Sequence, residues 1–442
     1  MTTEPESDVP TTRSGPSLAN ATRVFHHRNY RLFFSGQLVS LIGTWMQSVA
    51  QAWLILELTH DPFMLGLTTA AQFLPVLVFG LFGGLIADAV PKRRTLIVTQ
   101  LIQMVLAFAL FALTVSGSVE IWQILVLALV LGVTNAVDMP TRQAFVVEMV
   151  GREDLPNAVA LNSATFNMAR IVGPAVAGLL IGAIGIGVAF LVNGLSFLAV
   201  IVAYSFMNED ALQRAAVLAR PDGIRAVGRS LAEGLRFIRS SELVLLSMIV
   251  IGLSSMLGMN LRVVVPALAD EVLHLDATGF GFLMTATGVG SLLAAASIAV
   301  MPREHVGLIA GGAMLMGAAQ VVAAFATTMP LALAAMLAVG FGAIGMLATG
   351  NTAIQLRSPD ALRGRVMSVY TVLFVGATPV GGLIAGSIAS AWGVPMALAL
   401  GGSACVVVGA AAYVWLHRIR VRERLVPPTA IAGTSPADIG PA

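Results

Sequence analysis

The stretch that decides the fold reads GGLIADAVPKRR and occupies residues 83–94. An apolar run that starts at Pro62 leads into it, and a second apolar run begins directly after it at Thr95. Pro91 interrupts a helix because it has no backbone N–H, and a basic cluster favours the cytoplasmic side of a membrane. The stretch therefore predicts a short cytoplasmic loop between two membrane-spanning helices.

The glycines and the aspartate of this stretch indicate a role beyond that of a charged loop. Gly83 and Gly84 remove side chains, as small residues do where helices pack closely in lipid. Asp88 lies at the membrane edge, where a carboxylate can accept hydrogen bonds from backbone or arginine groups. A purely topological loop would explain the basic cluster but neither the glycines nor the aspartate.

The composition indicates that lipid surrounds most of the chain. Of 442 residues, 57% are hydrophobic and 11% are charged, and the mean hydropathy is +0.87; a soluble core cannot bury so much apolar surface. The single cysteine, Cys405, excludes an intrachain disulfide. Without metal-ligand spacing or a nucleotide-phosphate loop, we expect no metal, no cofactor and no ATP-driven pump.

Charge-free intervals predict twelve membrane spans, because about 20 apolar residues cross a bilayer. We expect an all-α membrane protein with two six-helix bundles related by pseudo-twofold symmetry. The expected spans cover residues 32–56, 62–87, 95–116, 121–137, 243–269 with a bend at Pro266, and 276–301, together with pairs divided at 182–187, 327–330 and 392–395.

The expected organisation has five parts. A disordered N-terminal segment (1–22) precedes the first bundle, and a disordered tail follows the second. Between the bundles, Val227, Leu231, Leu235 and Ile238 recur at helical spacing among arginines, which predicts an amphipathic helix on the membrane surface. The parts are residues 1–22, 23–207, 208–241, 242–420 and 421–442.

Arginines fall on alternate loops of one face, whereas the opposite loops carry acidic residues such as Asp61, Glu120 and Asp276. The positive-inside rule makes the basic face cytoplasmic. We therefore expect a multi-pass plasma-membrane protein with both termini in the cytoplasm.

The loop at residues 83–94 resembles the signature of the major facilitator superfamily between its second and third helices. Gly84, Asp88, Lys92 and Arg93 match that signature, while Ala89 and Pro91 depart from it. The resemblance implies that this loop is a conformational latch, which joins the cytoplasmic ends of the two halves when they close.

Further charges lie near the same end of the first half. Asp138 is expected to end span four, and Arg142 follows it by one helical turn. Arg170 lies well inside span five, where an arginine is costly and usually faces a cavity or a partner. It is expected to pair with Asp138, in one network with Asp88 and Arg142, or with helix-end carbonyls near the cytoplasmic mouth; direct contact with substrate is the alternative.

Span five also contains Gly173-Pro174 and, four residues after Pro174, Gly178. These residues resemble the antiporter signature of the superfamily, which implies export, although Ala177 replaces one of its glycines. A packing kink without bearing on transport direction is the alternative.

Polar residues on the first span are candidates for a substrate cavity. Two glutamines share a face with Thr44 and Ser48 by their spacing, and interhelical hydrogen bonding explains this face equally well. Arg262 could select anionic substrates or pair with Asp270 or Glu271. The full candidate set is Gln37, Thr44, Gln47, Ser48, Gln51, Arg170, Arg262 and Asn351.

The runs at residues 29–37, 41–45 and 193–197 narrow the resemblance to a branch that contains enterobactin exporters and macrolide-efflux-type carriers. The resemblance implies a monomeric secondary exporter of a drug or siderophore that is driven by protons and binds no nucleic acid. Thr44 replaces an aspartate of many relatives, which puts proton coupling in doubt. An uptake carrier of the same fold and a membrane-embedded transferase are the alternatives.

Overall fold

The computed structural model describes residues 23–213, 224–301 and 305–425, without the side chains of residues 81–89, 224–227, 230–231, 420 and 422–425. All regular elements in this part of the chain are helical. Its first group of helices comprises α2 (Arg28–Thr59), α3 (Pro62–Ala89), α4 (Lys92–Val115), α5 (Ile121–Ile184) and α6 (Gly187–Ser205), with short 3-10 turns at Arg23–His26 and Glu209–Ala211. The second comprises α8 (Glu242–Gly258), α9 (Leu261–Ala267), a π-helix (Leu268–Val272), α10 (Ala277–Val300), α11 (Gly307–Ala324), α12 (Met329–Arg357), α13 (Asp360–Trp392) and α14 (Val394–Leu425).

Eleven helices of the described chain are long and apolar enough to cross a membrane. One of them, α5, has 64 residues and contains two spans that are divided at Gly151, where φ is 74° and ψ is 177°. The count of twelve spans is therefore confirmed. Expected breaks are also found between α5 and α6, between α11 and α12, and between α13 and α14.

Two expected boundaries were wrong. The fourth span does not end at Asp138 but continues through Pro140 to Gly151, and Arg142 pairs with Asp138 one turn away on the same helix. The seventh span breaks at Met259-Asn260 instead of bending at Pro266. There the Asn260 side chain donates to the Met256 carbonyl at 2.8 Å, which satisfies a backbone acceptor left free at the end of α8.

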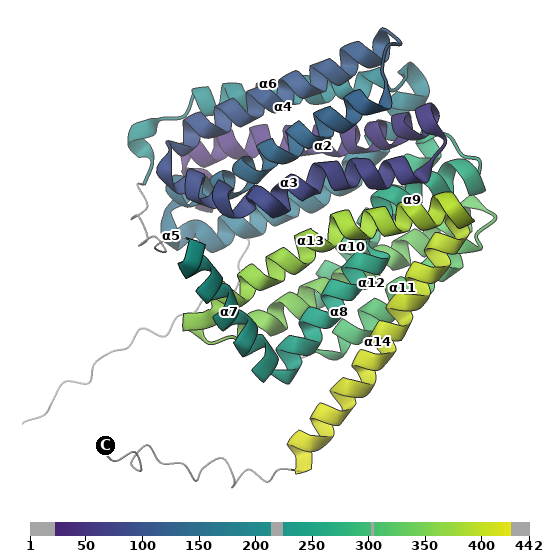
Figure 1. Ribbon diagram of the computed structural model, residues 1–442. Coiled ribbons are helices and arrows are strands. Elements are labelled where there is room, and N and C mark those ends of the chain that lie inside the picture. The colour runs from purple at the N-terminus through teal and green to yellow at the C-terminus, as the bar shows by residue number, and fades with distance from the viewer. Residues whose placement is uncertain (1–22, 214–223, 302–304, 426–442) are drawn as a thin grey trace, which may run out of the picture.

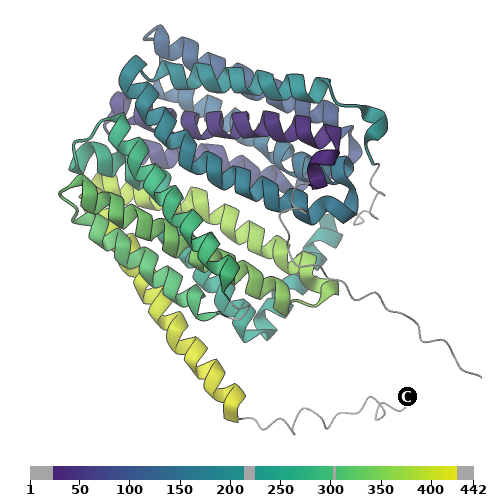
Figure 2. The same cartoon turned by 180° about the vertical axis from the view of Figure 1, so that it is seen from behind.

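The helices form two bundles whose contacts repeat (Figures 1 and 2). In the first bundle, α2 packs on α5 and α6, and α4 packs on α6; in the second, α8 packs on α13 and α14, and α11 packs on α14. The two bundles meet where α3 contacts α13 and where α5 contacts α10. These two contacts exchange under a twofold rotation, so the bundles are related by pseudo-twofold symmetry.

The helix between the bundles is α7 (Ile224–Ser240), as the amphipathic pattern predicts. It packs against α13 and α8 of the second bundle. Ile238 is buried, Leu235 is exposed, and Glu233 forms an ion pair with Arg365. The side chains of Val227 and Leu231 lie outside the described residues.

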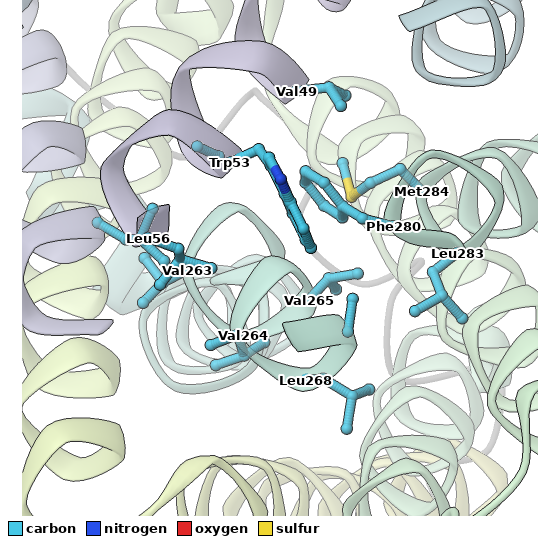
Figure 3. Close-up of a cluster of buried hydrophobic side chains, with 14 of the residues drawn as sticks. Val49, Trp53, Leu56, Val263, Val264, Val265, Leu268, Phe280, Leu283 and Met284 are labelled. Carbon is cyan, nitrogen blue, oxygen red and sulfur yellow. The ribbon is translucent and has the colours of Figure 1, made fainter. Parts of the chain in front are cut away.

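The two ends of the molecule differ in charge. We call the end with Asp61, Glu120 and Asp276 the acidic end, and the end with Lys92, Arg93 and Arg363 the basic end. At the acidic end an apolar cluster joins α2, α9 and α10 across the bundles (Figure 3). This acidic-end seal consists of Val49, Trp53, Leu56, Val263, Val264, Val265, Leu268, Phe280, Leu283 and Met284.

Candidate functional site

A central cavity of about 960 Å³ lies between the two bundles. Its walls come from α2, α3 and α5 of the first bundle and from α8 to α10, α12 and α13 of the second. The lining runs from Arg262 to Gln143, Leu155 and Phe374 in the direction of the basic end. The volume suits one organic molecule of ordinary drug size.

Arg262 reaches the cavity from the first turn of α9. Its guanidinium lies 5.4 Å from the centroid of the Trp45 ring and 5.5 Å from that of Phe73, so it contacts two aromatic faces of the first bundle. Of the two alternatives for Arg262, the pairing with Asp270 or Glu271 is not found among the ion pairs of the described residues. Those acids lie about two turns further along, roughly 12 Å away at the helical rise per residue.

Arg170 reaches the same cavity from the second half of α5. Its Nη2 donates to Asn167 Oδ1 at 3.0 Å, and its buried Nε has no hydrogen-bond partner among the described residues. The expected pair with Asp138 does not form, because Arg142 occupies that carboxylate.

The polar face of the first span lines a second, small pocket of about 100 Å³ inside the first bundle. Thr44, Gln47, Ser48 and Gln51 all contribute to it, and Arg262 closes one side. Gln47 also accepts a hydrogen bond of 2.6 Å from Asn193 on α6. This face therefore lines a pocket and joins helices at the same time.

Two cavity candidates lie elsewhere. Gln37 is buried beside Arg142, and with its amide oriented to accept, it receives hydrogen bonds of 3.1 Å from Nε and Nη1 of that arginine. Asn351 accepts a hydrogen bond from Gln355 on its own helix. Neither residue lines the central cavity or the small pocket.

Asp138 is the most enclosed carboxylate of the described chain, with no exposed surface. Arg142 forms an ion pair with it, Thr99 donates to it at 2.7 Å and Gln100 at 3.1 Å. These donors stabilise the ionised form inside the bundle, because a buried charge needs a partner and hydrogen bonds.

The basic residues after the signature loop bind within the first bundle. Lys92 pairs with Glu148 at 2.8 Å. Arg93 pairs with Glu209 and donates to the carbonyls of Tyr204 and Ser205 at the end of α6, where a cation favours the helix dipole. The side chains of Gly84 and Asp88 lie outside the described residues.

The residues of the antiporter-like motif pack where the bundles meet. A Cβ added at Gly281 of α10 would lie 2.5 Å from the Pro174 carbonyl, and one at Gly178 would lie 3.0 Å from the Ala277 carbonyl. Thr278 donates to the Gly178 carbonyl at 3.2 Å. Gly173 instead packs on α2, where an added Cβ would lie 2.4 Å from the Cβ of Trp45.

Sequence reasoning missed the aromatic side of the cavity. Trp45 contacts Phe166 edge to face, with centroids 5.7 Å apart, and Phe73 and Phe374 complete the lining. Trp45 lies beside the polar face of the first span, which was the available signal. Phe73 and Phe166 carry no such signal, because aromatic residues are equally common on faces that contact lipid.

Comparison with known proteins agrees with this architecture. A family model described as "transmembrane secretion effector" matches residues 20–429. A multidrug efflux pump, Tap, of Mycolicibacterium fortuitum is 29% identical over 82% of this chain and 89% of its own. The enterobactin exporter EntS of Escherichia coli is 24% identical over 95% and 99%, and a staphyloferrin A transporter of Staphylococcus aureus is 22% identical over 89% and 97%.

Solved structures share the fold at low identity. A bacterial homologue of the lysosomal transporter Spinster, solved in an inward-facing and unoccupied conformation, has a TM-score of 0.66 and 13% identity, over 93% of this chain and all of that one. The POT family transporter PepTSo has a TM-score of 0.69 and 13% identity, over 90% of this chain and 99% of that one.

Proposed function

The chain belongs to the transmembrane secretion effector family of the major facilitator superfamily, and from this premise we propose that it exports small organic compounds across the plasma membrane by alternating access. The similar efflux pump and the similar enterobactin exporter support this direction. Drugs and siderophores are therefore the candidate substrates, bound one at a time by a monomer.

The central cavity is the observation that carries the proposal. It lies between two bundles, and the acidic-end seal closes it on one side, whereas no comparable cluster between the bundles is found at the basic end among the described residues. With the basic end in the cytoplasm, as the positive-inside rule favours, both termini are cytoplasmic and the structure corresponds to an inward-facing state. Export then requires that the seal opens while the basic end closes.

The signature loop supplies a candidate latch for that second state. In the present state Lys92 and Arg93 bind partners of their own bundle. We expect Asp88 and Gly84 to contact the second bundle once the basic end closes, as the family resemblance implies.

Protons are the proposed coupling ion, with Asp138 as the candidate site of protonation. Protonation of this carboxylate would release Arg142, which is the residue that Gln37 of the first span also contacts. The arrangement links a change of charge to the position of α2 against α5.

The experiment uses everted membrane vesicles with the protein and matched vesicles without it. Three fluorescent aromatic probes, 2-naphthoate, 2-naphthamide and ethidium, are tested with an imposed pH gradient, inside acidic. We expect protein-dependent accumulation of at least one probe, abolished by a protonophore. Accumulation in right-side-out vesicles only would identify an uptake carrier, and accumulation that ignores the gradient would reject proton coupling.

A further inference from the structure

The central cavity contains two arginines and no described acidic residue. Arg170 and Arg262 both belong to its lining, and no aspartate or glutamate of the described chain does. Neither arginine forms an ion pair with a described carboxylate. A positive charge at membrane depth normally has a partner or serves a function, so the missing counter-ion points to a ligand.

The Arg262 guanidinium is held by ring faces rather than by acceptors. Its Cζ lies over the rings of Trp45 and Phe73, and none of the described hydrogen bonds of the cavity region involves its N–H groups. A cation–π interaction uses no N–H donor of the guanidinium, so these donors remain available for bidentate binding of a carboxylate.

Arg170 adds a second cation with an unused donor. Only its Nη2 has a described acceptor, Asn167, while its Nε is buried without one. A buried donor without an acceptor is unfavourable, so the hydrogen bonding of this cavity-lining cation is incomplete among the described residues.

Arg262 also lies at the junction of two spaces with different chemistry. It lines the small pocket, where uncharged amides such as Gln47 and Gln51 lie beside apolar side chains and Arg262 is the only charged residue of the lining among the described residues, and it lines the large cavity with Phe166 and Met284. The small pocket has room for about three water molecules. That space suits a carboxylate or a similar headgroup, whereas the large cavity has room for an aromatic body.

We propose that the central cavity selects amphipathic organic anions, with the anionic group at Arg262 beside the small pocket and the apolar body in the large cavity. Arg170 supplies the second positive charge of the cavity. This inference rests on the proposed export function, whose substrate class it names. The positive charges of Arg170 and Arg262 repel organic cations, so these should bind to the cavity more weakly than anions of the same size.

Three probes with one aromatic body and different charge test the proposal: 2-naphthoate, 2-naphthamide and 2-naphthylmethylammonium. Calorimetry on the purified full-length protein in detergent at pH 7 and low salt gives the affinities. We expect the carboxylate to bind about tenfold or more tightly than the amide, and the ammonium to bind most weakly. Equal affinities, or preference for the ammonium, would overturn the proposal.

Variants locate the selectivity. Arg262→Gln should lower the preference for carboxylate over amide to about one, whereas Arg262→Lys should retain part of it. Arg170→Gln should lower it less. Arg363→Gln is the control, because Arg363 pairs with the largely exposed Asp360 and does not line the cavity. An unchanged preference in Arg262→Gln would reject the assigned position of the anion even where the wild-type order holds.

Binding and transport fail separately in these assays. Calorimetry measures the charge preference without transport. A charge preference in calorimetry without probe accumulation in vesicles would support the anion site and reject the export function. Accumulation of 2-naphthamide or ethidium in vesicles without a charge preference in calorimetry would support the export function and reject the anion site.

Discussion

The indole of Trp53 on α2 stacks on the ring of Phe280 on α10, with centroids 6.0 Å apart and planes inclined by 21°. The two rings belong to different bundles and lie at the centre of the acidic-end seal (Figure 3). A hydrogen bond of 2.8 Å from the indole nitrogen to Glu57 fixes the tryptophan. The pair therefore reports whether the acidic end is closed.

Phe280→Ala should open the acidic end more often. An aromatic pair contributes about 0.5–1.5 kcal/mol beyond the area it buries, which corresponds to roughly a two- to tenfold change in the population of the two states. The measurement is the labelling rate of Val49→Cys, a buried position of the seal, by a membrane-impermeant maleimide from the acidic side. Cys405→Ala removes the buried native thiol.

Phe282→Ala is the control for this experiment, because Phe282 lies on the same helix with 38% exposure and is not part of the seal. We expect its labelling rate to match that of the parent. Equal rates in Phe280→Ala and in the control would show that the stacked pair does not hold the acidic end closed.

Gly281→Ala should weaken the contact between α5 and α10. The added methyl would lie 2.5 Å from the Pro174 carbonyl, so the helices must separate at the antiporter-like motif. We expect faster labelling of Val49→Cys and slower probe transport. Gly311→Ala is the matched control, because no atom lies within 4 Å of its added Cβ. Equal labelling and transport rates in Gly281→Ala and Gly311→Ala would show that the contact between α5 and α10 at this motif does not control opening of the acidic end.

The sequence predicted the number of spans, the two bundles and most loop positions, because about 20 apolar residues between charges are a strong signal. It failed at Asp138, where a charge within a helix was taken as the end of a span, and at Pro266, where a bend was expected and the helix instead breaks at Met259-Asn260. At Asp138 a partner one turn away satisfies the charge. The break at Asn260 packs against Gly381 of α13, where an added Cβ would lie 2.7 Å from Asn260 Oδ1, and local sequence does not reveal such a contact.

The site was predicted less completely than the fold. Thr44, Gln47, Ser48 and Gln51 do line a pocket, because helical spacing sets a shared face. Partners of the charged residues were harder to predict. Arg262 lies over the Trp45 ring of the other bundle rather than beside an acid of its own segment. Which of these partners it contacts depends on how the two bundles pack, and that packing cannot be predicted from one sequence.

Asp88→Asn should slow transport while the protein still folds and inserts. The proposed latch acts only in the state with the basic end closed, so the substitution should change the rate of cycling rather than the affinity of this state for a probe. Vesicle transport and calorimetry distinguish these effects. Asp360→Asn is the control, since Asp360 is a highly exposed acid at the same end. Transport at the wild-type rate in Asp88→Asn would reject the proposal that this loop acts as a latch.

Asp138 and Arg142 should behave as one unit in a double-mutant cycle. Asp138→Asn leaves Arg142 without its carboxylate, and removing one partner of a buried pair costs about 3–5 kcal/mol. Arg142→Gln leaves the carboxylate with only Thr99 and Gln100 as donors. The double variant should lose less stability than the sum of the single losses, with a coupling of about 0.5–3 kcal/mol, measured by denaturant unfolding in detergent micelles. Additive losses would show that the two side chains act independently.

Both variants that lack Asp138 should also transport without response to the pH gradient, because the proposed proton site is gone. A retained response to the gradient would place the proton elsewhere.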